Sequence, residues 1–169
     1  MRKTLLMCIV LLMACTTAMG KKKVNTVELW PDGTEIPAWF SDTSRVDVSG
    51  LKRYVVTDYG VDRWADGVQT KALQAVIDQC AAEGGGVVVI PRGTFLSGSL
   101  FFKPKTHLLI EEGGELKGSD RIRDFQIVKT RMEGQTLNYF AALVNADGVD
   151  GVTITGPGTI NGNGQKYWE

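Results

Sequence analysis

Leu108-Leu-Ile-Glu-Glu-Gly-Gly-Glu-Leu-Lys-Gly118 and Val152-Thr-Ile-Thr-Gly-Pro-Gly-Thr-Ile-Asn-Gly162 are two copies of one pattern, 44 residues apart. Without a gap, the following positions coincide: Leu108 with Val152, Ile110 with Ile154, Gly114 with Gly158, Leu116 with Ile160, and Gly118 with Gly162. Each copy indicates a strand with alternating apolar positions, a glycine turn and a second short strand. One such unit cannot bury its apolar face alone, so it must stack on its copies. The repeat therefore predicts an all-β fold, a right-handed parallel β-helix (solenoid).

The sequence around the repeat has the same pattern of glycines and short apolar runs. The stretch from Gly84 to Gly164 holds 15 of the 20 glycines, between short runs of β-branched and aromatic residues. Boundaries at Gly, Pro or Ser predict strands over 87–90, 94–96, 100–102, 107–110 and 115–117. We also expect a strand over 54–60 and a further one over 141–144. The solenoid domain is accordingly expected to cover residues 54–169, as its helix cap and first coils.

One helix is predicted ahead of these strands, over about residues 66–82. Asp66 offers an N-cap, with Gln69 three residues later as a variant of the capping box. An apolar stripe with helical spacing follows: Leu73, Val76, Ile77, Cys80 and Ala81. Gly84-Gly85-Gly86 ends the helix. A single amphipathic helix before a solenoid is expected to cover the apolar face of the first coil.

Residues 119–138 interrupt the pattern between the two copies. They show no regular apolar alternation, and we expect a loop inserted into one coil. Solenoids carry such insertions on the binding face. Its basic residues are Arg121, Arg123, Lys129 and Arg131. They could bind carboxylates of an acidic sugar, although a solvated basic loop is the simpler interpretation.

The amino terminus predicts export to the periplasm or the extracellular space. Arg2 and Lys3, an apolar run and Ala18-Met19-Gly20 form a signal peptide over residues 1–20. The run is too short for a membrane span. Leu12-Met13-Ala14-Cys15 also resembles a bacterial lipobox, so lipidation of Cys15 is an alternative.

Residues 21–53 are expected to form an extended arm. Its aromatic residues are Trp30, Trp39 and Phe40. They could stack on sugar rings, but packing along the solenoid is the simpler interpretation.

Charge and cysteine content exclude some classes. Loss of residues 1–20 leaves 17 basic and 19 acidic residues, a net charge of −2, which does not indicate a nucleic-acid partner. Beyond Cys15, only Cys80 remains, so no internal disulfide is possible.

The chain resembles a known family over about residues 54–169. Asp58-Tyr-Gly-Val61, Asp66-Gly67 and Gly84-Gly-Gly-Val-Val-Val-Ile-Pro-Arg-Gly93 are similar to the start of pectin-degrading β-helices. Gly156-Pro-Gly-Thr-Ile-Asn-Gly-Asn-Gly164, followed by Tyr167-Trp168, resembles the signature of glycoside hydrolase family 28, the polygalacturonases. Asn161 stands where that family usually has Asp, a residue that is neither the acid nor the base of the reaction.

The resemblance implies a secreted hydrolase that cleaves galacturonosyl linkages in pectin with inversion of configuration. Such enzymes hold two carboxyl groups about 6.5–9.5 Å apart, so that a water fits between them. Family members carry the catalytic aspartates on coils downstream of the signature, so no catalytic residue can be assigned here. Residues 21–169 alone are therefore expected to be inactive. No cofactor or metal is expected, the partner is a pectic polysaccharide or oligosaccharide, and the full-length protein is expected to be a monomer.

Other carboxylates and the single histidine have simpler explanations. Glu111 and Glu112 are neighbours on a strand and point to opposite faces. His107 is expected to be a strand residue rather than a base. Asp147 and Asp150 flank a turn glycine, and metal binding by them is the weaker interpretation.

Two further functions stay open at this stage. One is a non-catalytic β-helix that acts as a carbohydrate-binding or structural module. The other is a polysaccharide lyase, which uses Ca²⁺ and a basic residue; the Gly156–Trp168 segment favours the hydrolase.

Overall fold

The computed structural model describes residues 29–41 and 46–167, which belong to two compact units, Met1–Arg45 and Val46–Glu169. In the first unit, Leu29 and Glu35 form an antiparallel bridge around a turn, and α2 covers Ala38–Ser41. The predicted signal segment 1–20 and Cys15 lie outside the described residues.

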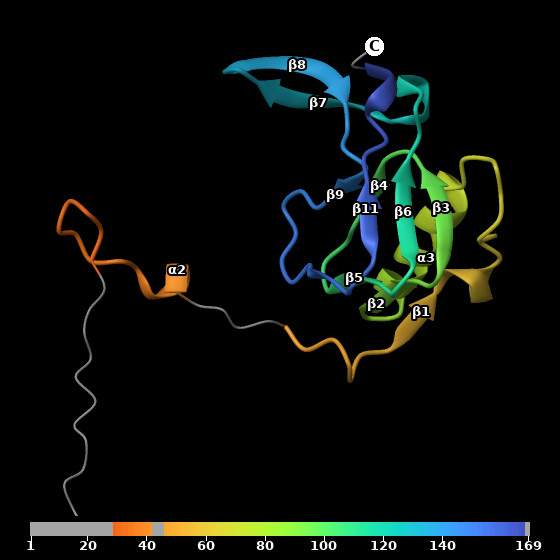
Figure 1. Cartoon of the computed structure of the whole chain (residues 1–169), viewed down its shortest axis with the longest axis horizontal. Helices are drawn as coiled ribbons and strands as arrows, with labels where there is room; N and C mark the ends of the chain where they lie inside the picture. Colours follow the sequence, from red (N-terminus) through yellow and green to blue (C-terminus); the bar gives the residue numbers. More distant parts are fainter. Residues whose placement is uncertain (1–28, 42–45, 168–169) are drawn as a thin grey trace, which may run out of the picture. The chain divides into compact units, whose positions relative to one another are not determined.

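Strands in parallel sheets dominate the second unit (Figure 1). The first sheet has the order β1-β2-β5-β10, with β1 at Arg53–Val55, β2 at Gly86–Ile90, β5 at Thr106–Ile110 and β10 at Ile154–Thr155. The second has the order β11-β6-β3, with β3 at Gly93–Ser97, β6 at Gly114–Gly118 and β11 at Thr159–Asn161. β4 (Leu100–Phe101) pairs with β9 (Val144–Asn145). The predicted all-β class with parallel pairing is thus confirmed.

Apolar residues stack in rows from strand to strand. Val88 pairs with Leu108 and Ile90 with Ile110 in the first sheet, and all four side chains are buried. In the second sheet Phe95 pairs with Leu116, and both are fully buried. Because parallel partners lie side by side, each row forms a continuous strip of the core. All five strands predicted between residues 87 and 117 are present.

The helix α3 covers Thr70–Ala82 and packs against β2, β4 and the 3-10 helix η1 at Val56–Tyr59. Leu73, Val76, Ile77 and Cys80 are buried, as the apolar stripe predicts. The predicted N-cap at Asp66 is wrong, since the helix begins four residues later. The Gln69 side chain binds both backbone groups of Asp62 instead, and the Gln69 N–H donates to the Leu96 carbonyl at 2.8 Å.

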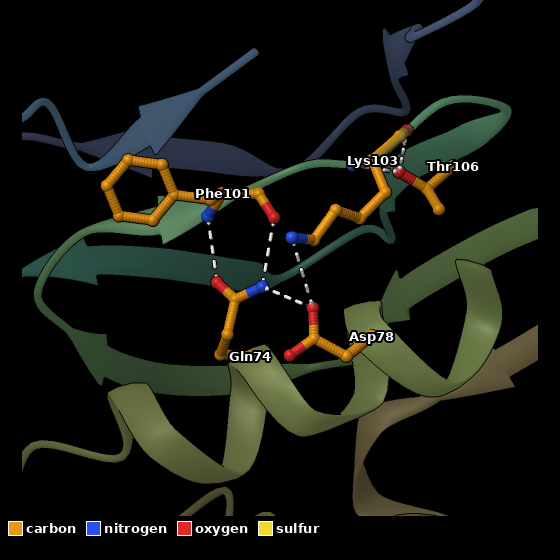
Figure 2. A network of polar contacts seen from close by, with 5 residues as sticks. All are labelled: Gln74, Asp78, Phe101, Lys103 and Thr106. Carbon is orange, nitrogen blue, oxygen red and sulfur yellow. Dashed lines mark hydrogen bonds and ion pairs between the residues drawn. The ribbon is translucent and has the colours of Figure 1, made fainter. Parts of the chain in front are cut away.

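A side chain of α3 completes the hydrogen bonding of β4 (Figure 2). The Phe101 N–H donates to Gln74 Oε1 at 2.8 Å, and Gln74 Nε2 donates to the Phe101 carbonyl at 2.9 Å and to Asp78 Oδ1 at 3.0 Å. Lys103 Nζ lies 4.0 Å from the same Asp78 oxygen. The Gln74 amide pairs with the strand as a neighbouring backbone would, so this edge of β4 has no unpaired backbone groups at Phe101.

The two repeat copies pair with different offsets in the two sheets. Ile160 pairs with Leu116, the predicted offset of 44, but Ile154 pairs with Leu108, an offset of 46. The ungapped alignment is therefore wrong by two residues in the first sheet. Ile154 and Ile160 are six residues apart, whereas their partners Leu108 and Leu116 are eight apart, so the second copy is two residues shorter between the paired positions. The Gly158 N–H donates to the Ile110 carbonyl and joins the two copies there. A shift of two keeps every side chain on its predicted face.

Residues 119–138 are not an irregular loop, and this prediction is wrong. After the 3-10 helix η2 (Ile122–Asp124), β7 (Ile127–Met132) and β8 (Gln135–Phe140) form an antiparallel hairpin, which extends beyond the parallel sheets in Figure 1. Its two turn residues, Glu133 and Gly134, both have positive φ, as the turn type that matches strand twist requires.

Two strand predictions were too long. The segment 54–60 turns from β1 into η1 and closes with Gly60 in a left-handed conformation. The segment 141–144 contributes only Val144 to β9. In both segments, some of the apolar residues that suggested a strand lie outside the strands and still pack into the core. Val56 and Ala141 are buried in this way.

Candidate functional site

Polar side chains gather on the outward face of the second sheet. Register places Thr94, Glu115 and Thr159 in one row, and Leu96, Lys117 and Asn161 in the next. Successive residues of a strand point to opposite faces, and the intervening Phe95 and Leu116 are buried. The same strands therefore supply the core on one face and a polar surface on the other.

Glu115 is the centre of this surface. Asn161 Nδ2 donates to Glu115 Oε1 at 2.8 Å, and Thr94 Oγ1 donates to Oε2 at 2.9 Å. These hydrogen bonds, that from Asn161 first, hold the pKa of the Glu115 carboxyl below its usual value. The Asn163 N–H donates to Asn161 Oδ1 at 2.8 Å, so the Asn161 amide uses both ends.

Trp64 projects from a loop that is held in place beside β3. The Trp64 N–H donates to Asp62 Oδ1 at 2.9 Å, and Gln69 fixes the Asp62 backbone as described above. The Trp64 side chain is nevertheless 77% exposed. A large aromatic ring presented to solvent by a hydrogen-bonded loop is available for a ligand.

A cavity of about 390 Å³ lies between this loop and the polar face. It is lined by Arg63, Trp64, Ala65, Asp66, Thr94, Leu96, Lys117, Asp120 and Asn163. Asp120 already forms two ion pairs: Lys166 Nζ lies 3.4 Å from Oδ2, and Arg121 Nε lies 3.7 Å from Oδ1. Within residues 46–167, Arg63 and Lys117 form no ion pair. Neither Trp64 nor Lys117 was predicted as a site residue, because only strand register and a loop bring them together.

The four carboxylates considered in the sequence analysis do not line this cavity. Glu111 and Glu112 are in the turn after β5, where Arg53 Nη2 contacts Glu111 Oε1 at 2.6 Å. Asp147 and Asp150 are exposed between β9 and β10. In the described part of the chain no three His, Cys, Asp or Glu side chains gather as a metal site would require.

His107 lies in β5 beside Val87 and is 7% exposed. Its Nδ1 atom is buried and has no hydrogen-bond partner in the described residues. It does not line the cavity beside Trp64.

The basic residues of segment 119–138 are divided between two places. Lys129 and Arg131 alternate on β7 and share one exposed face of the hairpin. Arg121 and Arg123 precede the hairpin, and Arg121 contacts Asp120.

Phe40 contacts both Trp30 and Trp39 in the first unit. The ring centroids of Trp30 and Phe40 are 4.8 Å apart, and those of Trp39 and Phe40 are 5.9 Å apart. Their packing along the solenoid stays a prediction. None of the helices in residues 29–41 and 46–167 has the length and apolar character of a membrane span.

Replacing Asn161 by aspartate is expected to make stability depend on pH. The change puts a second carboxylate against Glu115 and removes its hydrogen-bond donor, so one carboxyl pKa rises. In the parent, the lowered pKa of Glu115 contributes stability that is present at neutral pH and lost on acidification. In the variant this contribution is lost, and we expect about 1–2 kcal/mol less stability at pH 7. The deficit should shrink as the pH falls below about 5, where the raised carboxyl is protonated.

Urea unfolding at pH 7 and pH 4 measures this effect. Asn138→Asp is the matched control, because Asn138 is exposed on β8 and pairs with Lys129 rather than with a carboxylate. A deficit in the Asn161 variant that is equal at both pH values would contradict the predicted repulsion.

The comparisons with known proteins point to one enzyme family. No protein-family model matches the chain. Over 119 residues it is 30% identical to the exo-poly-alpha-D-galacturonosidase of Dickeya chrysanthemi, a match that covers 66% of this chain and 19% of that protein. The chain therefore spans about a fifth of the length of this curated relative.

Solved structures agree with the sequence match. The family 28 exopolygalacturonase of Yersinia enterocolitica is 31% identical with a TM-score of 0.61, over 67% of this chain and 21% of that one. The hyperthermoactive exopolygalacturonase of Thermotoga maritima is 27% identical with a TM-score of 0.60, over 66% and 25%. The polygalacturonase of Erwinia carotovora, 23% identical with a TM-score of 0.53 over 73% and 32%, supports the fold alone. These matches confirm the resemblance predicted from the sequence: the chain is similar, over about two thirds of its length, to part of a family 28 polygalacturonase.

Proposed function

We propose that this chain forms the amino-terminal part of an exported glycoside hydrolase that cleaves galacturonosyl linkages in pectin. The observation that carries the proposal is the similarity, in sequence and in strand arrangement, to the Yersinia enterocolitica family 28 exopolygalacturonase. Export is inferred from the signal segment 1–20. The substrate class covers homogalacturonan and rhamnogalacturonan, between which nothing in the chain decides.

In this proposal the sheets are the first coils of a right-handed parallel β-helix, and α3 covers the end of its core. The stacked apolar rows support this architecture. In the most carboxyl-terminal described strands, Ile154 is 51% exposed and Ile160 is 44% exposed, although their partners Leu108 and Leu116 are buried. These half-exposed positions are where a further coil would pack.

The chemistry is proposed to be hydrolysis with inversion. One carboxylic acid protonates the leaving oxygen, while a carboxylate on the other side of the bond activates water. We assign neither role to a residue of this chain. Here the described strands build the scaffold from which such coils continue, and the polar face around Glu115 is part of its surface.

Assays on pectic substrates test the proposal. We expect the protein read from the gene beyond codon 169 to release reducing sugars from polygalacturonate or rhamnogalacturonan oligosaccharides in EDTA, with inverted anomers. Residues 21–169 alone should release none. Unsaturated products that absorb ultraviolet light, or a strict Ca²⁺ requirement, would replace the hydrolase by a lyase. A stop codon after Glu169 would favour a non-catalytic module instead.

A further inference from the structure

We infer that the cavity beside Trp64 binds an acidic sugar, with the ring against Trp64 and the carboxylate toward Arg63 and Lys117. The choice of galacturonate as the sugar rests on the function proposed above. The cavity itself stands on geometry: its volume of about 390 Å³ lies within the range of small-molecule pockets, about 300–1,000 Å³.

The exposed ring of Trp64 provides the stacking surface. The C–H face of a pyranose is apolar and flat enough to cover an indole, so stacking removes apolar surface of both rings from water. The loop is already fixed by Asp62 and Gln69, so little conformational entropy is lost when a ligand binds. Gly93 allows this loop to approach β3, because a Cβ there would lie 2.9 Å from Arg63 Cβ.

The charges favour a carboxylate ligand. Arg63 and Lys117 line the cavity and form no ion pair within residues 46–167, although the charge of Lys117 acts on the nearby Glu115 carboxylate; Asp120 is already engaged by Lys166 and Arg121. An arginine and a lysine together bind a carboxylate through charge-assisted hydrogen bonds. Within residues 46–167 Asp66, which also lines the cavity, forms no ion pair and can accept a hydrogen bond from a sugar hydroxyl.

The polar groups at the floor are already oriented. Asn163 Nδ2 donates to the Gly118 carbonyl at 3.0 Å, and within residues 46–167 no group donates to the Asn163 side-chain oxygen. Thr94 is held by Glu115. Thr94 and Asn163 therefore line the cavity as side chains with fixed orientations.

Nuclear magnetic resonance of the ¹⁵N-labelled chain tests the site with two probes, trigalacturonate and its uncharged trimethyl ester. We expect the Trp64 indole signal to shift saturably with trigalacturonate, and that of Trp39 to stay unchanged. Trp39 is a suitable internal reference, because its exposed fraction of 75% is close to the 77% of Trp64. The ester should bind at least about tenfold more weakly, since it lacks the charge.

Variants assign the contacts. Trp64→Ala and Lys117→Gln should each weaken trigalacturonate binding about tenfold or more, and Lys117→Gln should leave ester binding unchanged. Lys71→Gln, an exposed lysine outside this cavity, is the control. Unchanged amide spectra elsewhere would show that the variants fold.

The inference is overturned if trigalacturonate shifts both indoles equally or neither, or if the ester binds as tightly as the acid. Failure of the site leaves the proposed hydrolase intact when the longer protein still cleaves galacturonan. Conversely, saturable binding without cleavage by the longer protein refutes the proposed function but supports the site.

Discussion

Replacing Leu73 by aspartate is expected to abolish cooperative unfolding of the chain. Leu73 is 1% exposed, in the stripe of α3 that faces the core. The change removes a buried leucine side chain, a loss of about 2–5 kcal/mol in measured cases. It also buries a carboxyl group without a partner, which adds further cost. Because domains are stable by only about 5–15 kcal/mol, the variant should lack a sharp transition.

Circular dichroism during heating measures this result. Ala75→Asp is the control, since Ala75 is exposed on the same helix and the same residue is created. It should cost only the difference in helix propensity, about 0.5–0.7 kcal/mol. If the Leu73 variant unfolds within a degree or two of this control, α3 is not docked on the sheets.

The parts of the fold that follow from local pattern were predictable. The stripe of α3 and the five strands between residues 87 and 117 depend on apolar spacing and on bounding glycines, and these signals act within a few residues. The helix start was not predictable in this way. Asp66 has the right chemistry for a cap. However, the Gln69 side chain binds the Asp62 backbone, and the Gln69 N–H donates to the Leu96 carbonyl of β3. These tertiary contacts place the helix start at Thr70.

The hairpin was missed because its apolar residues do not alternate cleanly. Lys129 and Arg131 share a face with Ile127, so neither face is uniformly apolar. The available signal was the turn, where Gly134 allows a two-residue connection. The shift of two residues in the first sheet was also beyond an ungapped alignment, since the second copy has two residues fewer between its paired positions.

The candidate site was not visible in the sequence for a different reason. Trp64, Lys117 and Asn163 are far apart in the chain and carry no shared motif. Only the register of β3, β6 and β11, together with the loop over β3, brings them to one cavity. Asn161 shows the same effect: a departure from the family pattern in sequence is, in the fold, a hydrogen-bond donor to Glu115.

Replacing Gly86 by alanine is expected to destabilise the chain by about 3–5 kcal/mol. Gly86 begins β2 with φ of 155°, which side chains rarely adopt. A Cβ at this position would lie 2.5 Å from the Lys52 carbonyl oxygen and 2.8 Å from the ring of Tyr54. Tyr54 is fully buried and cannot move aside without disturbing the core. The backbone conformation accounts for about 1–3 kcal/mol and the overpacking for a similar amount.

Gly84→Ala separates these two contributions by denaturant unfolding. Gly84 lies in the same turn with φ of 99°, but a Cβ there would meet nothing within 4 Å. Both variants reduce the entropy of the unfolded chain equally, so this gain cancels in the comparison. The Gly84 variant should lose only about 1–2 kcal/mol, from the backbone alone. If both variants lose the same free energy of unfolding, Lys52 and Tyr54 relax freely around the new methyl group. Gly86 would then be required for its backbone conformation rather than for close packing.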